Sequence, residues 1–87
     1  MIYEVRYSAK AQKQLKKLDK SVVRVLIAWI EKNLVNTSDP RIHGKGLTAN
    51  KSGFWRYRIG NYRIIADIKD NELIIEVVEV AHRSVIS

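Results

Sequence analysis

The chain contains no cysteine, a single proline and no apolar run long enough to cross a membrane. The absence of cysteine excludes disulfide bonds, a thiolate nucleophile and a cysteine-ligated zinc site. The longest uninterrupted apolar run, residues 25–30, is far shorter than the roughly 20 residues of a membrane-spanning helix. The first residues also lack the basic and then apolar pattern of a signal peptide. The sequence therefore predicts a cytoplasmic protein without a membrane partner.

The length of 87 residues allows one small domain, which we place at residues 1–87. A domain of this size buries only about 60% of the surface of its unfolded chain, so it needs one compact core. The hydrophobic content of 46% can supply that core. We therefore expect a single folded unit.

Acidic residues are scarce, because nine Asp and Glu stand against sixteen Lys and Arg and leave a net charge of +7. Such an excess favours a polyanionic partner such as nucleic acid, although charge also serves solubility alone. One stretch, residues 41–66, contains no acid at all. Its cations are Arg41, Lys45, Lys51, Arg56, Arg58 and Arg63. This acid-free stretch is the first feature of the sequence that indicates a function.

The first part of the chain reads as one strand and two helices. Apolar and charged residues alternate over residues 3–6, which is typical of a short strand. Helical spacing of apolar residues then predicts one helix that ends near residue 18 and a second at residues 22–34. Suitable N-caps are Ser8 for the first helix and Asp19 or Ser21 for the second. Trp29 falls on the apolar stripe of the second helix and is expected in the core.

A long loop and three strands are expected in the second part. Residues 36–52 are rich in turn formers, and His43 within them is interpreted as a solvated side chain. The strands are expected at residues 54–59, 62–68 and 73–81. Gly60-Asn61 and Asp70-Asn71 suit two-residue hairpin loops between them. The expected fold is α+β with the order β-α-α-β-β-β, in which a helical hairpin packs on an antiparallel sheet.

A two-residue loop at Gly60-Asn61 brings three arginines to one face of the sheet. In this register Arg58 lies opposite Arg63, and Arg56 projects from the same face because side chains alternate along a strand. Like charges directly opposed destabilise a sheet, which is easiest to understand if a phosphate backbone occupies the face. The alternative is a set of surface ion pairs, worth about 0 to 1 kcal/mol each. The acids available for such pairs are Asp67 and Glu76.

Several sequence motifs, which together span nearly the whole chain, resemble those of a known family. They are GFWRYRIGNYRIIA at residues 53–66, VAHR at residues 80–83, YSAK at residues 7–10 and LKKLD at residues 15–19. Together they resemble the RelE/ParE superfamily of type II toxin-antitoxin toxins, close to the RelE branch. The resemblance implies a RelE-like fold and a toxin that enters the ribosomal A site and cuts mRNA there as an endoribonuclease, without a metal or other cofactor.

The resemblance also implies partners and site residues. A small, acidic, RelB-like antitoxin would wrap the toxin, and operator DNA would be reached only through that antitoxin. The family's basic positions, which bind RNA phosphates and stabilise the transition state, fall here on Arg56, Arg58, Arg63 and Arg83. We assign Arg63 and Arg83 to catalysis. We assign RNA binding to Arg56, Arg58, Lys45 and Lys51.

The proton transfers of RNA cleavage need a further group. Arginine suits the charged phosphate because it stays protonated and binds through a planar fork, but it is a poor proton carrier near neutral pH. His82 is the histidine nearest the motif and is our third catalytic candidate, because imidazole suits acid–base work. Adjacent residues on a strand point to opposite faces, so His82 and Arg83 enter one site together only if a bulge or strand end intervenes. The family often has a tyrosine shortly after His-Arg, where this chain has Ser84-Val85-Ile86-Ser87.

The sequence is compatible with two other functions. A ParE-like toxin shares the fold but inhibits DNA gyrase by binding protein, and it would tolerate the loss of Arg58. A non-catalytic module would repress a promoter together with its antitoxin. No metal site is predicted, because His43 and His82 lie far apart and no carboxylates recur at ligand spacing.

Overall fold

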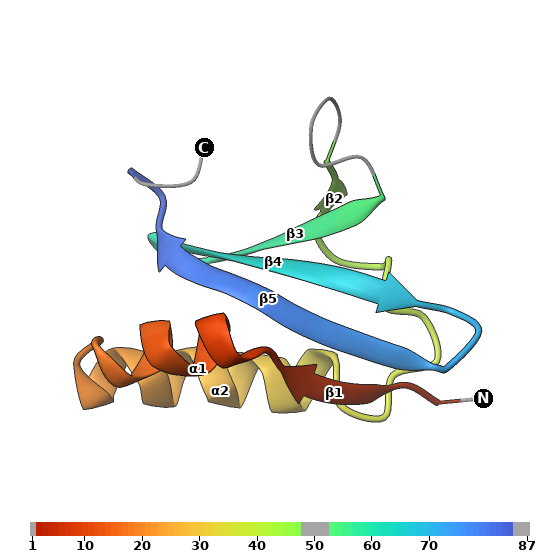
Figure 1. Cartoon of the computed structure of the whole chain (residues 1–87), viewed down its shortest axis with the longest axis horizontal. Helices are drawn as coiled ribbons and strands as arrows, with labels where there is room; N and C mark the ends of the chain where they lie inside the picture. Colours follow the sequence, from red (N-terminus) through yellow and green to blue (C-terminus); the bar gives the residue numbers. More distant parts are fainter. Residues whose placement is uncertain (1, 48–52, 85–87) are drawn as a thin grey trace.

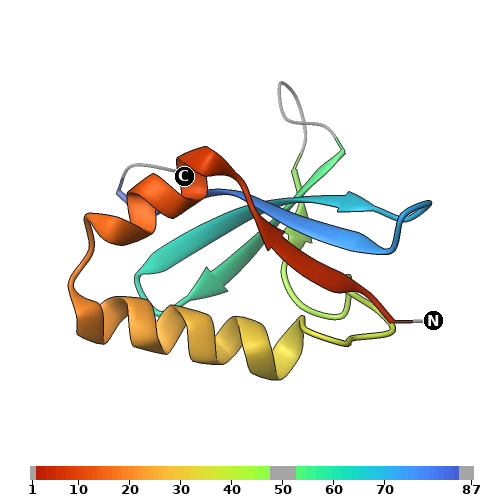
Figure 2. The ribbon, with the colours of Figure 1, turned by 60° about the horizontal axis from the view of Figure 1, so that its bottom comes forward.

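The computed structural model describes residues 2–47 and 53–84. Its elements are β1 (Glu4–Tyr7), α1 (Ala9–Lys16), α2 (Lys20–Asn33), β2 (Lys45–Gly46), β3 (Phe54–Ile59), β4 (Tyr62–Lys69) and β5 (Ile74–His82). The strands form one sheet in the order β1-β5-β4-β3-β2. Figure 1 shows both helices on one face of this sheet, and Figure 2 turns that helical layer toward the viewer. The expected α+β class is confirmed.

The helix boundaries follow the capping residues. Ser8 is the N-cap of α1, and its hydroxyl accepts a hydrogen bond from the backbone N–H of Ala11 at 3.1 Å. Helix α1 ends at Lys16, slightly earlier than expected. Asp19 occupies the N-cap position of α2 without a side-chain capping bond. The backbone conformation at Asp19, more than its carboxylate, therefore sets the start of the second helix.

The sheet differs from the expected one at both edges, by a parallel strand at one edge and an additional antiparallel strand at the other. β1 pairs in parallel with β5, so the sheet is mixed. A parallel neighbour needs a long connection, and here all the intervening elements supply it. At the other edge β2 pairs antiparallel with β3, inside the stretch that we expected to be loop. Two residues are too few for a hydrophobic period to reveal a strand.

The second hairpin turn is longer than expected. Lys69 lies opposite Ile74, so the turn comprises residues 70–73 instead of the two residues Asp70-Asn71. Leu73 adopts a φ of 55°, a left-handed conformation that sequence reasoning does not assign to leucine. β4 and β5 also contain a register shift between Ile65 and Ala66. The first hairpin has the predicted register, from Ile59 opposite Tyr62 onward.

The core lies between the helices and the sheet. Its fully or nearly fully buried members are Ala11, Leu26, Ile30, Leu34, Tyr57, Ile59, Ile64, Ala66, Ile75, Val77 and Val80. Tyr57 is completely buried, as the hairpin register predicts for the face opposite the arginines. Burial of this apolar cluster positions the hairpin, and the hairpin in turn positions the cations on the far face.

Candidate nucleic-acid interface

The cations of β2, β3 and β4 project from the sheet face that the helices leave open. Arg58 lies directly opposite Arg63, as predicted, and Arg56 lies opposite Ile65. The unexpected strand β2 adds a second opposed pair of cations, because Lys45 lies opposite Arg56. We call the surface formed by Lys45, Arg56, Arg58, Arg63 and Arg83 the cationic face.

The electrostatics at Arg63 show how closely these charges gather. Its Nε atom is buried and has no hydrogen-bond partner. Desolvation lowers the pKa of Arg63, and the neighbouring charges of Arg56, Arg58 and Arg83 lower it further. The predicted convergence of these arginines is therefore present, with Arg63 at its centre.

The end of β5 separates Arg83 from His82. The backbone N–H of Arg83 donates to the carbonyl of Asn61 at 2.8 Å, which ties it to the turn next to Arg63. His82 lies opposite Tyr62, and the two rings meet edge to face with centroids 5.3 Å apart. Its Nδ1 accepts a hydrogen bond from the backbone N–H of Ser84 at 3.2 Å. The structure therefore brings Arg83 into the cationic face and places His82 beside Tyr62 on the other side of the sheet.

Two acids of β5 are paired with lysines and not with the arginines of the cationic face. Glu76 contacts Lys69 at 3.3 Å, and Glu79 contacts Lys10 at 3.6 Å. Within residues 2–47 and 53–84, no ion pair includes an arginine of the cationic face. The alternative in which Asp67 and Glu76 neutralise the arginines is therefore not seen. Lys51, the remaining predicted RNA-binding residue, lies outside the described residues.

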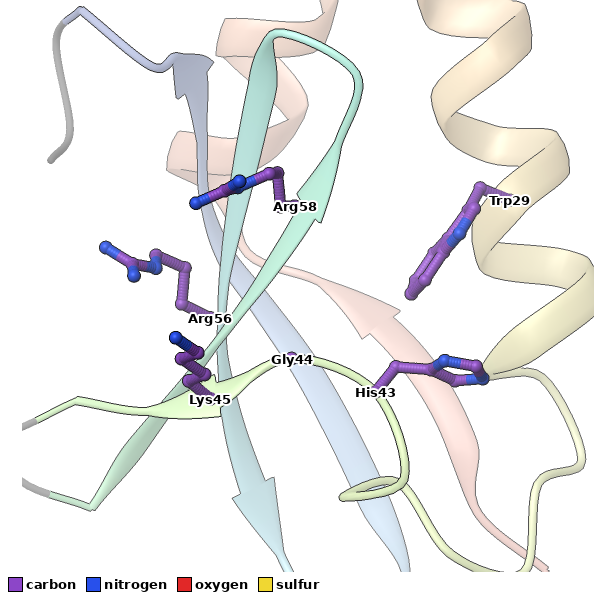
Figure 3. Close-up of a pocket in the computed structure, with 6 residues that line it drawn as sticks. All are labelled: Trp29, His43, Gly44, Lys45, Arg56 and Arg58. Atoms are coloured by element: carbon purple, nitrogen blue, oxygen red, sulfur yellow. The ribbon is translucent and has the colours of Figure 1, made fainter.

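A cavity of about 390 Å³ adjoins the cationic face, and sequence reasoning did not predict it. Its lining residues are Trp29, His43, Gly44, Lys45, Arg56 and Arg58 (Figure 3). Trp29, which we expected in the core, is partly buried and packs against it, with its ring centroid 5.6 Å from that of Tyr57. Its ring also meets the ring of His43 at 5.5 Å and an angle of 69°, so His43 is not merely solvated. No periodicity relates the helix to the loop, so this contact cannot be predicted from the sequence.

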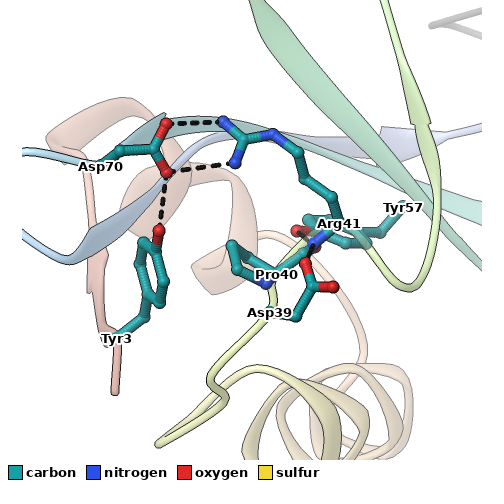
Figure 4. Close-up of polar contacts among 6 residues, drawn as sticks. All are labelled: Tyr3, Asp39, Pro40, Arg41, Tyr57 and Asp70. Atoms are coloured by element: carbon teal, nitrogen blue, oxygen red, sulfur yellow. Dashed lines mark hydrogen bonds and ion pairs between the residues drawn. The ribbon is translucent and has the colours of Figure 1, made fainter. Parts of the chain in front are cut away.

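The segment that carries His43 is fixed to the sheet by a polar cluster. Arg41 donates two hydrogen bonds to the carboxylate of Asp70, at 3.0 and 3.1 Å, and the hydroxyl of Tyr3 donates a third at 2.6 Å (Figure 4). The Arg41 bonds, followed by the Tyr3 bond, lower the pKa of Asp70. The buried hydroxyl of Tyr57 donates to the carbonyl of Pro40 at 2.5 Å. These bonds set the position of the segment relative to β3.

The described residues contain neither a metal-binding cluster nor a helix that could span a membrane. No group of three or more His, Asp or Glu side chains in residues 2–47 and 53–84 is placed to hold a metal ion. No helix in this part of the chain is long and apolar enough to cross a membrane.

Comparisons with known proteins place this geometry in a family. A chain of the toxin-antitoxin complex RelBE2 from Mycobacterium tuberculosis is 26% identical, with a TM-score of 0.86 and coverage of 97% of this chain and 94% of that one. The isolated RelE toxin of Escherichia coli is 20% identical, with a TM-score of 0.73 and coverage of 92% and 83%. The archaeal RelE–RelB complex from Pyrococcus horikoshii contains a chain that is 20% identical, with a TM-score of 0.69 and coverage of 95% and 97%.

No curated protein sequence matches the chain. The family model described as the ParE toxin of the type II toxin-antitoxin system parDE matches residues 5–86. The chain therefore belongs to the ParE toxin family, within the RelE/ParE superfamily of toxin-antitoxin toxins, and its fold is that of the RelE toxins.

Proposed function

We propose that this toxin is a ribosome-dependent endoribonuclease that cuts mRNA in the A site. The observation that carries the proposal is the cationic face, where four arginines converge without an ion pair among the described residues. The positive charge of this face is not compensated by acids of the described residues, and an RNA backbone provides negative charges at regular intervals. Guanidinium groups also match the planar geometry of phosphate oxygens.

The proposed roles follow from position on this face. Arg63 and Arg83 stabilise the charge that develops on the phosphate when the 2′-hydroxyl attacks it, because the charges of the other three arginines converge on Arg63. Arg56, Arg58 and Lys45 bind the flanking phosphates, and Lys51 joins them in the proposal. Arginine provides this stabilisation as a fixed cation, so we propose cleavage without a metal ion at the toxin.

The assignment of His82 to proton transfer stays a prediction. Its ring packs on Tyr62, away from the cationic face, and its Nδ1 is already bonded to the Ser84 backbone. A His82→Asn variant tests the assignment in the cleavage assay. Activity equal to that of the wild type would remove His82 from the mechanism.

Translating ribosomes provide the decisive assay. We expect purified toxin to produce codon-positioned cuts in mRNA, and Arg63→Ala and Arg58→Ala to slow cutting by about 10²- to 10³-fold, as for the loss of one transition-state donor. Arg24→Ala is the matched control, because it removes the same charge from the exposed surface of α2. Because ribosomes need magnesium, metal rescue tests the metal-free part of the proposal: a change of divalent ion should not restore cutting by Arg63→Ala. Intact mRNA after incubation with the wild type would contradict the proposal.

A second candidate function rests on the family model, which describes a ParE toxin. In that case the toxin would bind DNA gyrase, and the cationic face would not act on RNA. Blocked gyrase supercoiling with intact mRNA, and unchanged inhibition by Arg58→Ala, would favour this candidate. If the protein neither cuts mRNA nor blocks gyrase, a non-catalytic module that represses with its antitoxin is the remaining candidate.

We also propose that a small acidic antitoxin binds this toxin, as solved complexes of relatives from M. tuberculosis and P. horikoshii contain antitoxins. A hollow of about 620 Å³ between α1 and α2 offers it a site. The hollow has apolar residues and cations along it: Leu15, Leu18, Val23 and Ile27 with Lys16, Lys20 and Arg24. An amphipathic segment with an acidic flank complements both parts. Ile27→Asp should abolish co-purification with the antitoxin of the same operon, whereas Val25→Asp, outside this hollow, should not.

A further inference from the structure

Strand β3 has an open edge beside the cationic face. β2 pairs only with Trp55 and Arg56, and no other described strand pairs with β3 on that side. Next to this pair the N–H of Leu47 donates to the carbonyl of Phe54 at 2.9 Å. Outward-pointing backbone groups alternate along an antiparallel strand, so those of Phe54, Arg56 and Arg58 all face this edge. The backbone N–H and carbonyl of Arg58 therefore point away from β4, beyond the end of β2.

Gly44 marks the place where the chain turns away from this edge. Its φ is 81°, and a Cβ atom there would lie 2.3 Å from the carbonyl oxygen of Arg56. Only glycine allows the backbone to approach the carbonyl of Arg56 so closely, because it has no Cβ atom. Because the chain leaves β3 here, the cavity remains beside Arg58. We call this cavity the β3 notch; its lining is Trp29, His43, Gly44, Lys45, Arg56 and Arg58.

The β3 notch has an aromatic side and a cationic side. Figure 3 shows Trp29 and His43 on one side of β3, with Arg56, Arg58 and Lys45 extending on the other. The two rings meet at 69°, so they form a corner, and the ring of Trp29 is only half-buried. No acid is among the lining residues. Aromatic rings next to arginines are the combination that binds the base and the phosphates of a single-stranded nucleotide.

We propose that the β3 notch binds one unstacked base of a single-stranded RNA whose neighbouring phosphates lie on the cationic face. This inference rests on the proposed RNA target and adds a base-binding site to it. The base packs against Trp29 and His43, while the outward N–H and carbonyl of Arg58 offer one donor and one acceptor to its edge. The RNA backbone then crosses β3 toward Arg56 and Lys45.

A peptide strand added to the same edge is the competing occupant. Between the end of β2 and the turn at Gly60, only Arg58 presents outward backbone groups. A peptide would therefore gain a single pair of ladder bonds, whereas strand addition depends on a continuous row of them. One donor and one acceptor suffice for the edge of a base, which favours the nucleotide.

The test measures binding of a fluorescein-labelled 2′-O-methyl hexaribonucleotide, which has no free 2′-hydroxyl and is not cut, in 50 mM salt. A single abasic site is moved along the six positions. We expect one position at which the missing base weakens binding to the wild type by about tenfold, in the range for stacking of one base on an aromatic side chain. His43→Ala and Trp29→Leu should weaken binding of the intact RNA similarly and should respond little to the abasic site at that position. Removal of the base and removal of the ring both abolish the same stacking contact, so their effects on binding are not additive.

His43→Phe is the matched variant, because it keeps an aromatic face and should bind like the wild type. His43 lies on an exposed segment, so its variants report even if Trp29→Leu fails to fold. If the intact RNA binds tightly and no abasic position weakens binding, the proposal of base binding in the β3 notch is wrong. Phosphate binding by the cationic face would then still hold. Absence of RNA binding by the wild type would overturn both proposals. Loss of antitoxin binding but not RNA binding in His43→Ala would assign the notch to a peptide.

Discussion

Arg63 combines a cost in folding with a role in the proposed function. Its Nε is buried without a partner, and three other guanidinium charges act on it. Because its pKa is lowered in the folded state, protonated Arg63 opposes folding at every pH at which it carries its charge. Residues that oppose folding in this way concentrate at functional sites, where the missing partner is the ligand.

Replacement of Arg63 by methionine should therefore separate stability from activity. Arg63→Met keeps the length of the apolar stem and removes the charge, so we expect a higher urea midpoint together with RNA cleavage slowed by at least about 10²-fold. Added salt should raise the midpoint of the wild type more than that of the variant, because it screens the repulsion.

The matched control for this charge removal is Arg24→Met, on the exposed surface of α2. It should leave both the urea midpoint and the cleavage rate nearly unchanged. A lower midpoint in Arg63→Met would show that the contacts of the Arg63 side chain outweigh the repulsion.

At the scale of single residues, the sequence predicts what alternation and turn chemistry determine. The Gly60-Asn61 turn predicts the opposition of Arg58 and Arg63, and the structure has it. The contact between Trp29 and His43 was beyond such reasoning, because it joins a helix to an irregular segment. The choice between His82 and Arg83 was equally open, since it depends on how the strand ends and on the bond from Arg83 to Asn61.

At the scale of elements, the segment before β2 decides the shape of the β3 notch. Residues 36–44 have no regular structure, yet hydrogen bonds fix them to Tyr3 just before β1, to β3 and to the turn after β4. The indole N–H of Trp55 donates to the carbonyl of His43 at 2.6 Å, directly before Gly44. The turn-rich composition predicted a loop, but it did not predict these anchors, because they join residues far apart in the sequence.

The pH dependence of folding should reveal the anchor at Asp70. The folded-state pKa of Asp70 is lowered, so its contribution to stability is present above its ordinary pKa of 3.8 and is lost as the pH falls below it. Asp70→Asn should lower the free energy of unfolding at pH 7 by up to about 1 kcal/mol, as for a solvent-exposed pair. Urea unfolding of both proteins between pH 7 and pH 2 should show this difference shrinking at the acid end.

Glu72→Gln is the control for that experiment, because it removes a carboxylate from the same turn. No side-chain hydrogen bond or ion pair of Glu72 occurs among residues 2–47 and 53–84. At pH 7 its stability should equal that of the wild type. If Asp70→Asn also matches the wild type at pH 7, the bonds in Figure 4 do not stabilise the fold.

At the scale of the whole molecule, the cations behind the net charge of +7 lie on both the helical layer and the open face of the sheet. The helical layer carries exposed lysines around an apolar hollow, which suits a protein partner. The open sheet face carries arginines that lack acidic partners among the described residues, which suits phosphates. Composition predicted a polyanionic partner, but only the fold shows that the cations of the hollow and those of the cationic face lie on opposite layers.

Salt dependence distinguishes a defined phosphate site from a diffuse field of charge. Binding of single-stranded nucleic acid weakens with salt by a slope of about 0.7 per phosphate contact on logarithmic axes. Five contacts from the cationic face, made by Lys45, Arg56, Arg58, Arg63 and Arg83, contribute about −3.5 to the slope for the uncleavable hexaribonucleotide. Arg58→Ala should reduce the magnitude of this contribution to about 2.8, whereas Arg24→Ala on the helical layer should leave it unchanged. Equal changes in the two variants would mean that the RNA responds to the total charge of the toxin and not to the cationic face.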